Sequence, residues 1–460
     1  MECHAAMQND VVLRTIFSYL DFNNLKQVRL VDNKWNSLSE KQFVNKSLVS
    51  IALGLNYSEN LTKTTIVPYI TLRGYLQAQH RSLPMWEVEM GQAFGDEVSD
   101  YFQKFKHFKV HYVGAWRASE QYAIQRETSL KHLAQLIEIM RRPDGSLRIN
   151  FEFGKTDNEQ RYGDGAAMVT SAINNCSNVT MGLKMRSCFN DDYYEPEPEL
   201  VLDAFPPETK FSTCTSIEIN SAQVEDTVLF FTNLQKLQFT SRCYRDVFPT
   251  VMDRIVQNLD QFDKLTDIRC EKSVLLENIG SLKKLSTPLK HLHLRIRCNF
   301  YSGIDDGYAE LEEILAKHSL TLESLQLSFK WKINFDDDDE DYDEGVNLGK
   351  IRTSDIFPKL KILAMTVVNS YRGSVSDYPS PEMLDIFGLQ EIFEEGRFYT
   401  KFPSLQFLKL HHAVTPGCSI QGNIFNDEAV TRFQNYGIVS ISQTNFVFAE
   451  ECTTDDENDY

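Results

Sequence analysis

Histidine and cysteine are the residue types in this sequence best suited to catalysis or metal binding, but their spacing matches no recognisable catalytic or metal-binding motif. The nine cysteines are scattered, odd in number and include no Cys-x-x-Cys pair, which argues against a disulfide framework or a zinc knuckle. His291 and His293 stand two residues apart and His411 and His412 are adjacent, with no cysteine or carboxylate at ligand spacing beside either pair. We expect these histidines to be surface residues, and we expect Cys243 and Cys298, which follow repeated apolar strings, to be buried structural residues.

Motifs for enzymatic chemistry are also missing from the sequence. It contains no Walker loop, no G-x-S-x-G and no H-E-x-x-H, the spacings that would bring a phosphate cradle, a nucleophile or a zinc site together. The string GDGAA at 163–167 could hold an anion at a helix N-terminus, but a glycine-containing turn before a helix is the favoured interpretation. The sequence therefore predicts a protein that is not an enzyme and uses no cofactor or metal.

Length and charge narrow the class of partner. At 460 residues the chain exceeds the size of one compact core, which predicts several domains or an elongated repeat array. The net charge is -18, but the stretches 191–199, 336–344 and 450–459 hold 19 of the 65 acidic residues and no Lys or Arg, so the remaining chain is nearly neutral. Net charge therefore gives little ground for excluding nucleic acid, and we expect that partner to be unlikely because the predicted binding face is mixed in charge.

The sequence shows no pattern of a secretory signal or a membrane helix, which favours a reducing compartment. The N-terminus has no basic region followed by an apolar stretch, and no run approaches the roughly 18 apolar residues of a membrane helix. We expect a cytoplasmic or nuclear protein without a membrane partner.

The first 45 residues carry helical periodicity. Apolar residues recur at offsets 0, 3, 4 and 7 in the string VVLRTIFSYL at 11–20, and then at intervals of three beyond Asp21, which stands where a helix cap is expected. Three short, closely spaced helices are predicted. Such a unit is too small to bury all its apolar side chains, so part of its surface should remain available to a partner.

This segment, 8–45, resembles the F-box. The resemblance rests on residues in the family's order and near its spacing: Leu13, Ile16, Phe17, Leu20, Leu25, Val28, Val31 and Trp35. The family's opening Leu-Pro is replaced by Gln8-Asn9, and the Cys after the valine is Asp32. The resemblance implies that these apolar residues dock onto the Skp-type linker protein of a cullin-RING ubiquitin ligase. The alternative is that they form only the core of a small helical cap.

A second pattern runs through the rest of the chain. Strings of the type L-x-x-L-x-L resemble the strand signature of leucine-rich repeats, and they begin at Cys214, Leu234, Leu265, Leu289, Leu322, Leu360 and Leu405. Degenerate copies are suggested at 105–110, 147–153 and 179–185, and segments of helical spacing lie between the strings at 274–285, 308–316 and 383–393. Strand and helix in alternation predict an α/β fold, a leucine-rich-repeat solenoid with a parallel sheet on the concave face and helices outside.

The predicted organisation is therefore an F-box at 8–45, a linker with poorly readable first repeats at 46–145, a solenoid at 146–448 and an acidic disordered tail at 449–460. The acidic run 336–344 is expected to be a loop insertion, with calcium binding as the less favoured alternative. The segment 102–117 interleaves aromatics with Lys and Arg, as single-stranded nucleic-acid sites do, but a repeat strand explains it better.

Alternation along the strands predicts a target-binding face. If the strands stack in register, side chains next to the buried leucines project together on the concave surface. The candidates are Lys236, Asp267, Arg269, His291, His293, Arg295, Phe407 and Lys409. Their mixed polarity suits a protein target. The chain is thus expected to be a substrate-recognition adaptor of a Skp-cullin-F-box ligase; the alternative is a leucine-rich-repeat scaffold without a ligase role.

Overall fold

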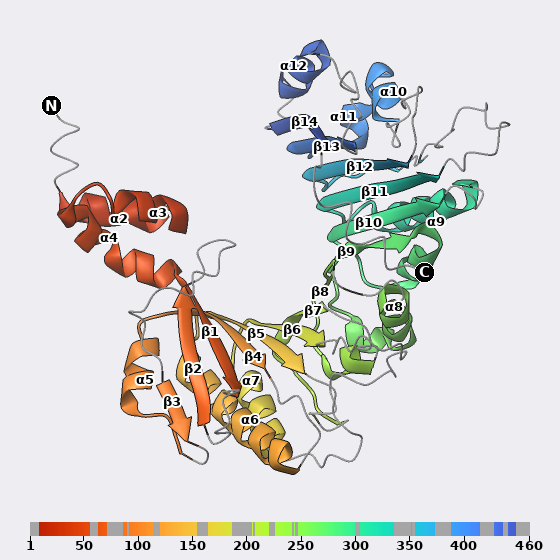
Figure 1. Cartoon of the computed structure of the whole chain (residues 1–460). Coiled ribbons are helices and arrows are strands. Elements are labelled where there is room, and N and C mark those ends of the chain that lie inside the picture. The colour runs from red at the N-terminus through yellow and green to blue at the C-terminus, as the bar shows by residue number, and fades with distance from the viewer. Residues whose placement is uncertain are drawn as a thin grey trace. The chain divides into compact units, whose positions relative to one another are not determined.

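The computed structural model divides the chain into two compact units, unit 1 (Met1–Asn233) and unit 2 (Leu234–Tyr460). Each unit combines parallel strands with helices (Figure 1). The structure describes residues 9–55, 63–70, 86–89, 92–113, 120–153, 164–185, 205, 208–219, 226–241, 243, 247–299, 304–334, 351, 355–372, 388–414, 427–435 and 440–447. The acidic run 336–344 and the tail 449–460 lie outside the described residues.

Unit 1 begins with three helices, α2 (Asp10–Tyr19), α3 (Phe22–Val28) and α4 (Asn33–Lys46). Each starts at a side chain that accepts hydrogen bonds from free backbone N–H groups of the first turn. Asn9 Oδ1 accepts from Val11 N at 2.9 Å, Asp21 Oδ1 from Asn24 N at 2.8 Å, and Asp32 Oδ1 from Trp35 N at 2.7 Å. The predicted cap at Asp21 is confirmed, and Asp32 has a structural role of its own.

The three helices share a hydrophobic core. Its buried members are Leu13, Phe17, Leu25 and Leu38, with Leu20, Val28, Trp35 and Phe43 packed around them. The Phe17 and Trp35 rings lie 5.6 Å apart between centroids. The Lys46 ammonium donates to the carbonyl oxygens of Ser18, at 2.8 Å, and Leu20, at 2.5 Å, which ties the end of α4 to the end of α2.

The sheet of unit 1 has the strand order β7-β6-β5-β4-β1-β2-β3. Its strands are β1 (Leu48–Leu55), β2 (Lys63–Ile70), β3 (Trp86–Glu89), β4 (His107–Val113), β5 (Ser146–Phe153), β6 (Val179–Met185) and β7 (Cys214–Ile219). The pairs β1–β2 and β2–β3 are antiparallel, whereas β1 and β4 to β7 pair in parallel. The connecting helices are α5 (Asp96–Phe102), α6 (Glu120–Met140), α7 (Asp164–Asn174) and the 3-10 helix η1 (Asp226–Phe230).

Unit 2 is a parallel sheet whose strands follow one another in chain order. They are β8 (Lys236–Phe239), β9 (Asp267–Leu275), β10 (His291–Asn299), β11 (Ser324–Asn334), β12 (Ile362–Arg372), β13 (Phe407–Val414) and β14 (Ser440–Val447). Helices connect them: α8 (Val247–Gln257), η2 (Leu259–Phe262), η3 (Leu276–Lys284), α9 (Ile304–His318), α10 (Leu389–Glu394), α11 (Phe398–Lys401) and α12 (Asp427–Asn435). Figure 1 shows α8 and α9 alongside these strands.

The predicted strand strings are confirmed as strands. In unit 2, β8 to β13 each begin two residues after the first apolar residue of a string, and equivalent positions pair across neighbours. One face of the sheet is buried: alternate side chains are at most 3% exposed, namely Leu237, Phe239, Ile268, Cys270, Leu292, Leu294, Leu325, Leu327, Leu363, Met365, Leu408 and Leu410. The α/β class with a long parallel sheet, as in a solenoid-like arrangement, is therefore observed.

Some local expectations differ from the structure. The segment 274–285 has helical spacing, yet β9 runs to Leu275 and the rest forms the 3-10 helix η3. In the poorly readable region 46–145, the structure has a strand, β1, that pairs with β4, an antiparallel pair, β2 and β3, and a 21-residue helix, α6. Parallel pairing thus already begins with β1 and β4, within the region where poorly readable first repeats were expected.

Candidate functional site

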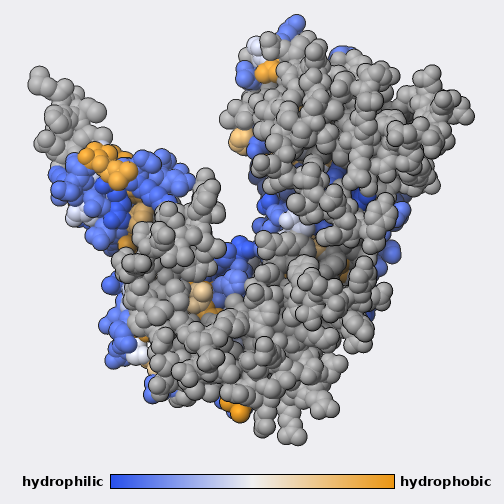
Figure 2. Space-filling model, viewed as in Figure 1, coloured by the Kyte–Doolittle hydropathy of each residue, from blue (hydrophilic) through white to orange (hydrophobic). Residues whose placement is uncertain are grey.

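An apolar surface covers part of the three N-terminal helices. We call it the helix patch; its members are Val11, Val12, Ile16, Tyr19, Leu30 and Val31, with exposures from 37% to 84%. Figure 2 shows hydrophobic residues gathered over these helices among hydrophilic ones. Tyr19 and Leu30 are the most exposed, at 84% and 79%. Large apolar side chains grouped on a small unit mark a surface that a partner would cover.

The residues predicted to bind a linker protein fall into two groups. Ile16 and Val31 are exposed and belong to the helix patch, whereas the others are core residues: Leu13, Phe17 and Leu25 are buried and Leu20, Val28 and Trp35 are partly buried. On α2, Leu13 and Phe17 face inward and pack in the core that the three helices share, so they are not available to a partner. The other exposed apolar residues are Val11, Val12 and Tyr19 on α2 and Leu30 in the turn after α3.

The second candidate surface is the half-exposed face of the unit 2 sheet, which we call the strand face. Its side chains alternate with the buried leucines. Strand register aligns seven of the candidates and their cross-strand neighbours in two rows, one with Lys236, Asp267, His291, Ser324, Ile362 and Phe407, the other with Gln238, Arg269, His293, Gln326, Ala364 and Lys409. Within the first row, Ser324 is buried.

Charge is distributed unevenly over the strand face. Lys236 faces Asp267 at 3.9 Å, and Arg269 pairs with Glu271 at 3.0 Å. On the later strands β12 and β13, both rows become partly apolar through Ile362, Ala364 and Phe407. The first two strands of the face, β8 and β9, therefore carry paired charges, and the later strands β12 and β13 carry apolar residues.

Two basic residues on this face lie beyond the predicted rows. Arg297 and Lys330 are cross-strand partners on β10 and β11, and Arg295 lies two residues before Arg297. Arg295 and Arg297 form no ion pair within the part of the chain that the structure describes. Sequence alternation could have found Arg297 and Lys330 by following each strand for four more residues. Together the three residues give β10 and β11 a basic character.

Of the two histidine pairs, only His291 and His293 have side chains that the structure describes. His291 is exposed, whereas His293 is half-buried, and burial, reinforced by the charge of Arg269, lowers the pKa of His293 to about 4. Across the described ranges, no three His, Cys, Asp or Glu side chains gather as metal ligands. His293 therefore presents a neutral imidazole on the strand face at physiological pH.

The cysteines whose side chains are described are buried. They are Cys176, Cys214, Cys243 and Cys270, all free thiols. Burial raises the pKa of Cys176 to about 11 and of Cys214 to about 12, and also raises the pKa of Cys270. Thiols held protonated in this way are poor nucleophiles and metal ligands. The expected burial is observed at Cys243, whereas the side chain of Cys298 lies outside the described residues.

The two weaker sequence signals have structural explanations. Gly165 of the GDGAA string is the second residue of α7, and its N–H donates to the Glu127 carboxylate of α6 at 2.7 Å. The Glu127 carboxylate thus already accepts the hydrogen bond that this amide could give to an external anion. In the basic and aromatic segment, Phe102 and Phe108 are buried with their rings 6.0 Å apart. These rings are core and do not form an exposed stacking platform for bases; residues 114–117 lie outside the described chain.

A shallow pocket of about 530 Å³ lies against α6 and α7. Its walls include Phe94, Gln135, Ile139 and Met168. The volume falls within the range of small-molecule sites. Within the described residues, no cluster of titratable groups lines the pocket, so its walls provide few groups that could catalyse a reaction or orient a polar ligand.

Comparisons with known proteins give this chain no family. No protein-family model matches it, and no curated protein does. A solved structure of a Bacteroides fragilis protein is similar over 84% of this chain and 92% of its own, with 11% identity and a TM-score of 0.30. A similarity at this level supports no inference about fold or function. Separately, none of the described helices has the length and apolar character required to cross a membrane.

Proposed function

We propose that this protein is a substrate-recognition adaptor of a Skp-cullin-F-box type ubiquitin ligase. In this proposal the three N-terminal helices dock onto the Skp-type linker protein, and the strand face of unit 2 binds a target protein in the cytoplasm or nucleus. The protein would perform no bond chemistry. It would act by holding the target at high effective concentration near the conjugating enzyme.

The helix patch is the observation that carries the proposal. Three short helices with a core of their own still leave six apolar side chains exposed. Burying such side chains contributes roughly 25 cal/mol per Å² of apolar area. An apolar stripe on α2 beside an internally packed stripe is the arrangement expected of an element that packs into a partner's helices.

The strand face supports the second half of the proposal. It is polar and half-exposed, with basic residues on β9 to β11 and apolar ones on β12 and β13. Mixed polarity with an aromatic side chain such as Phe407 suits a protein target. Arg295, Arg297 and Lys330 add a preference for acidic side chains on that target.

A pull-down with purified Skp-type linker protein tests the docking half. The full-length chain should retain the linker, whereas a Tyr19→Asp, Leu30→Asp double variant should bind about ten-fold less or worse, because two carboxylates would enter an apolar interface. Both side chains are highly exposed, so the substitutions leave the core intact. Lys41→Asp, an exposed change on α4, is the matched control and should bind as the unmodified chain does. Failure of the unmodified chain to bind, or equal binding by all three proteins, contradicts the proposal.

The second candidate function is a repeat scaffold whose helices only cap the sheet. One observation favours it: α4 ends at Lys46 and β1 begins at Leu48, so a single residue joins the helices to the sheet. Such a direct connection is what a cap requires. The two candidates differ in whether the sheet depends on the helices for its stability.

A further inference from the structure

A cluster of polar side chains lies on the half-exposed face of the unit 1 sheet, outside both surfaces described above. Lys109 on β4 is the cross-strand partner of Arg148 on β5, and Glu218 lies on β7. Directly paired neighbours on adjacent strands are separated by about 4.8 Å. Lys109 and Arg148 therefore project side by side from the same face.

Arg148 is held in place by two partners. It donates through Nη2 to the Glu218 carboxylate, forming an ion pair that spans β6, and through Nε to Asn150 Oδ1 at 3.3 Å. Gly182 on β6 makes room for this arrangement, since a Cβ there would lie 2.5 Å from Asn150 Oδ1. The Nη1 group of Arg148 bonds to no described residue.

Lys109 has no such partner. Its side chain is half-buried, yet its ammonium makes no hydrogen bond or ion pair with any residue that the structure describes. Burial lowers the pKa of Lys109, and the neighbouring Arg148 lowers it further, with Glu218 opposing. The one carboxylate of the cluster is already bonded to Arg148. Two cations thus share one anion, and the half-buried Lys109 is left without a charged partner of its own among the described residues.

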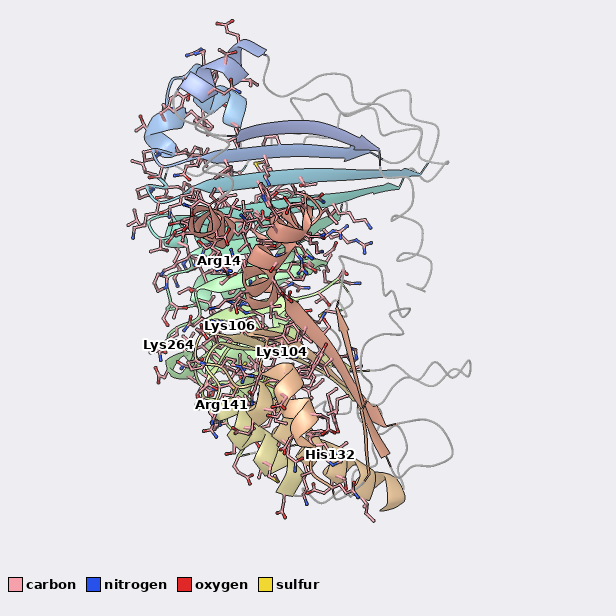
Figure 3. All side chains as sticks on the ribbon, turned by 90° about the vertical axis from the view of Figure 1, so that its left-hand side faces the viewer. Arg14, Lys104, Lys106, His132, Arg141 and Lys264 are labelled. Atoms are coloured by element: carbon pink, nitrogen blue, oxygen red, sulfur yellow. The ribbon has the colours of Figure 1, made fainter. Side chains whose placement is uncertain are left out.

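Unlike Lys109, the basic residues just before it in the sequence are either paired with another side chain or exposed to solvent. Lys104 and Lys106 precede β4, at the N-terminal edge of the sheet (Figure 3). Lys104 is exposed to solvent, and Lys106 is paired with Asp144. His107 bonds to the Ser146 hydroxyl at 2.9 Å. Lys109 therefore differs from its neighbours in being both half-buried and unpaired.

We infer that Lys109 and Arg148 form a binding site for an oxyanion, a carboxylate or phosphate group on a ligand of this protein. The anion would accept hydrogen bonds from Lys109 Nζ and from the free Nη1 of Arg148, while Glu218 and Asn150 fix the guanidinium plane. Thr180 and Ser216, on the same cross-strand row, bring hydroxyl donors along the face. This site goes beyond the proposed function, because it lies in unit 1 and does not depend on linker docking.

Nuclear magnetic resonance of the full chain with ¹³C-methylated lysines tests the inference. The probes are inorganic phosphate and, separately, acetate, and the Lys109 signal is assigned by its loss in Lys109→Arg. We expect that signal to shift saturably with phosphate or acetate, while the exposed Lys104 signal shifts only weakly and without saturation. Tighter binding of phosphate would identify a phosphoryl group as the ligand chemistry, and equal or tighter binding of acetate would identify a carboxylate.

Two variants of opposite effect separate binding from structural damage. Arg148→Gln should weaken the interaction about ten-fold, because it removes a charged donor. Glu218→Gln should strengthen it several-fold, because it removes the competing carboxylate, and a damaged fold would not bind more tightly. A Lys109 signal that does not saturate with either probe, or weaker binding by Glu218→Gln, would overturn the inference.

Discussion

His318, the last residue of α9, shows how one buried side chain sets a pH dependence. Its side chain is 2% exposed, and Nδ1 accepts a hydrogen bond from the Leu289 N–H at 3.3 Å. Burial lowers the pKa of His318 to about 4, and the charge of Lys317 acts in the same direction. Protonation of Nδ1 would break the bond from Leu289 and place a charge in the core.

We predict that unit 2 loses stability in acid through this residue. The unfolded histidine has a pKa of about 6.5, so below that pH the unfolded chain binds more protons than the folded one. The contribution is complete above about pH 6.5 and decreases as the pH falls toward the folded value of about 4. By about pH 4.5 the loss should reach roughly 2 to 3 kcal/mol.

Urea unfolding of the full chain and of His318→Gln, at pH 7 and about pH 4.5, measures this effect. The variant lacks the titrating group, so it should lose less stability on acidification than the unmodified chain. His293, whose pKa is also lowered to about 4, is present in both proteins and cancels in the comparison. An identical acid loss in both proteins would show that His318 does not carry the effect.

Residue-level roles in the helix patch could be predicted only in part from sequence. The spacing of Leu13, Ile16 and Phe17 correctly indicates a helix with one apolar side. It does not indicate which side chains face α4, because that depends on how the three helices cross. Leu13 and Phe17 are core and Ile16 is exposed. On the strand face, side chains alternate with a period of two, so the sequence alone indicates which residues lie opposite the buried leucines. Whether those residues bind a target stays a prediction.

At the scale of elements, the contact between α6 and α7 depends on one glycine. A Cβ at Gly165 would lie 2.7 Å from the backbone oxygen of Glu127 and 2.9 Å from Leu130 Cβ, so the helices approach closely there. Alanine is the better helix former by about 1 kcal/mol. A backbone oxygen cannot move aside as a flexible side chain can, so the overpacking cost should exceed that gain.

We therefore predict that Gly165→Ala destabilises unit 1 by about 1 to 3 kcal/mol. Urea unfolding followed by circular dichroism measures the change. Met168→Ala, at a 41% exposed position of the same helix, is the control and should change stability by less than about 0.5 kcal/mol. A Gly165→Ala protein at least as stable as the unmodified chain would mean that the helices are free to separate.

Elements with a repeated apolar string were predictable, and those without one were not. The strings locate the strands of unit 2 from β8 to β13 because leucine at a fixed offset must face the helices. The pair β2 and β3 carries no such string, and Pro68 within β2 argues against a strand. The spacing of Leu130, Leu133 and Ile137, all buried, was a usable signal for α6.

At the scale of the whole molecule, the helices and the sheet of unit 1 are adjacent in sequence but have separate interiors. The core cluster around Phe17 consists of side chains from α2 to α4 and the turns between them. Leu48, the first residue of β1, is 43% exposed where it follows the helices. Segments of one chain that have separate hydrophobic cores are expected to unfold independently of each other.

We predict that deletion of residues 1–46 changes the unfolding temperature of the remaining chain by less than about 2 °C, a shift that corresponds to less than roughly 1 kcal/mol for a domain of this size. The strands of unit 1 keep their pairing partners in the shortened chain, since β1 pairs with β2 and β4. Differential scanning calorimetry of the full and shortened chains gives the comparison. A helical cap would instead protect apolar residues of the sheet, and its removal would lower the unfolding temperature by several degrees, as expected for the scaffold without a ligase role. A small shift together with loss of linker binding is the combination that only the adaptor proposal predicts.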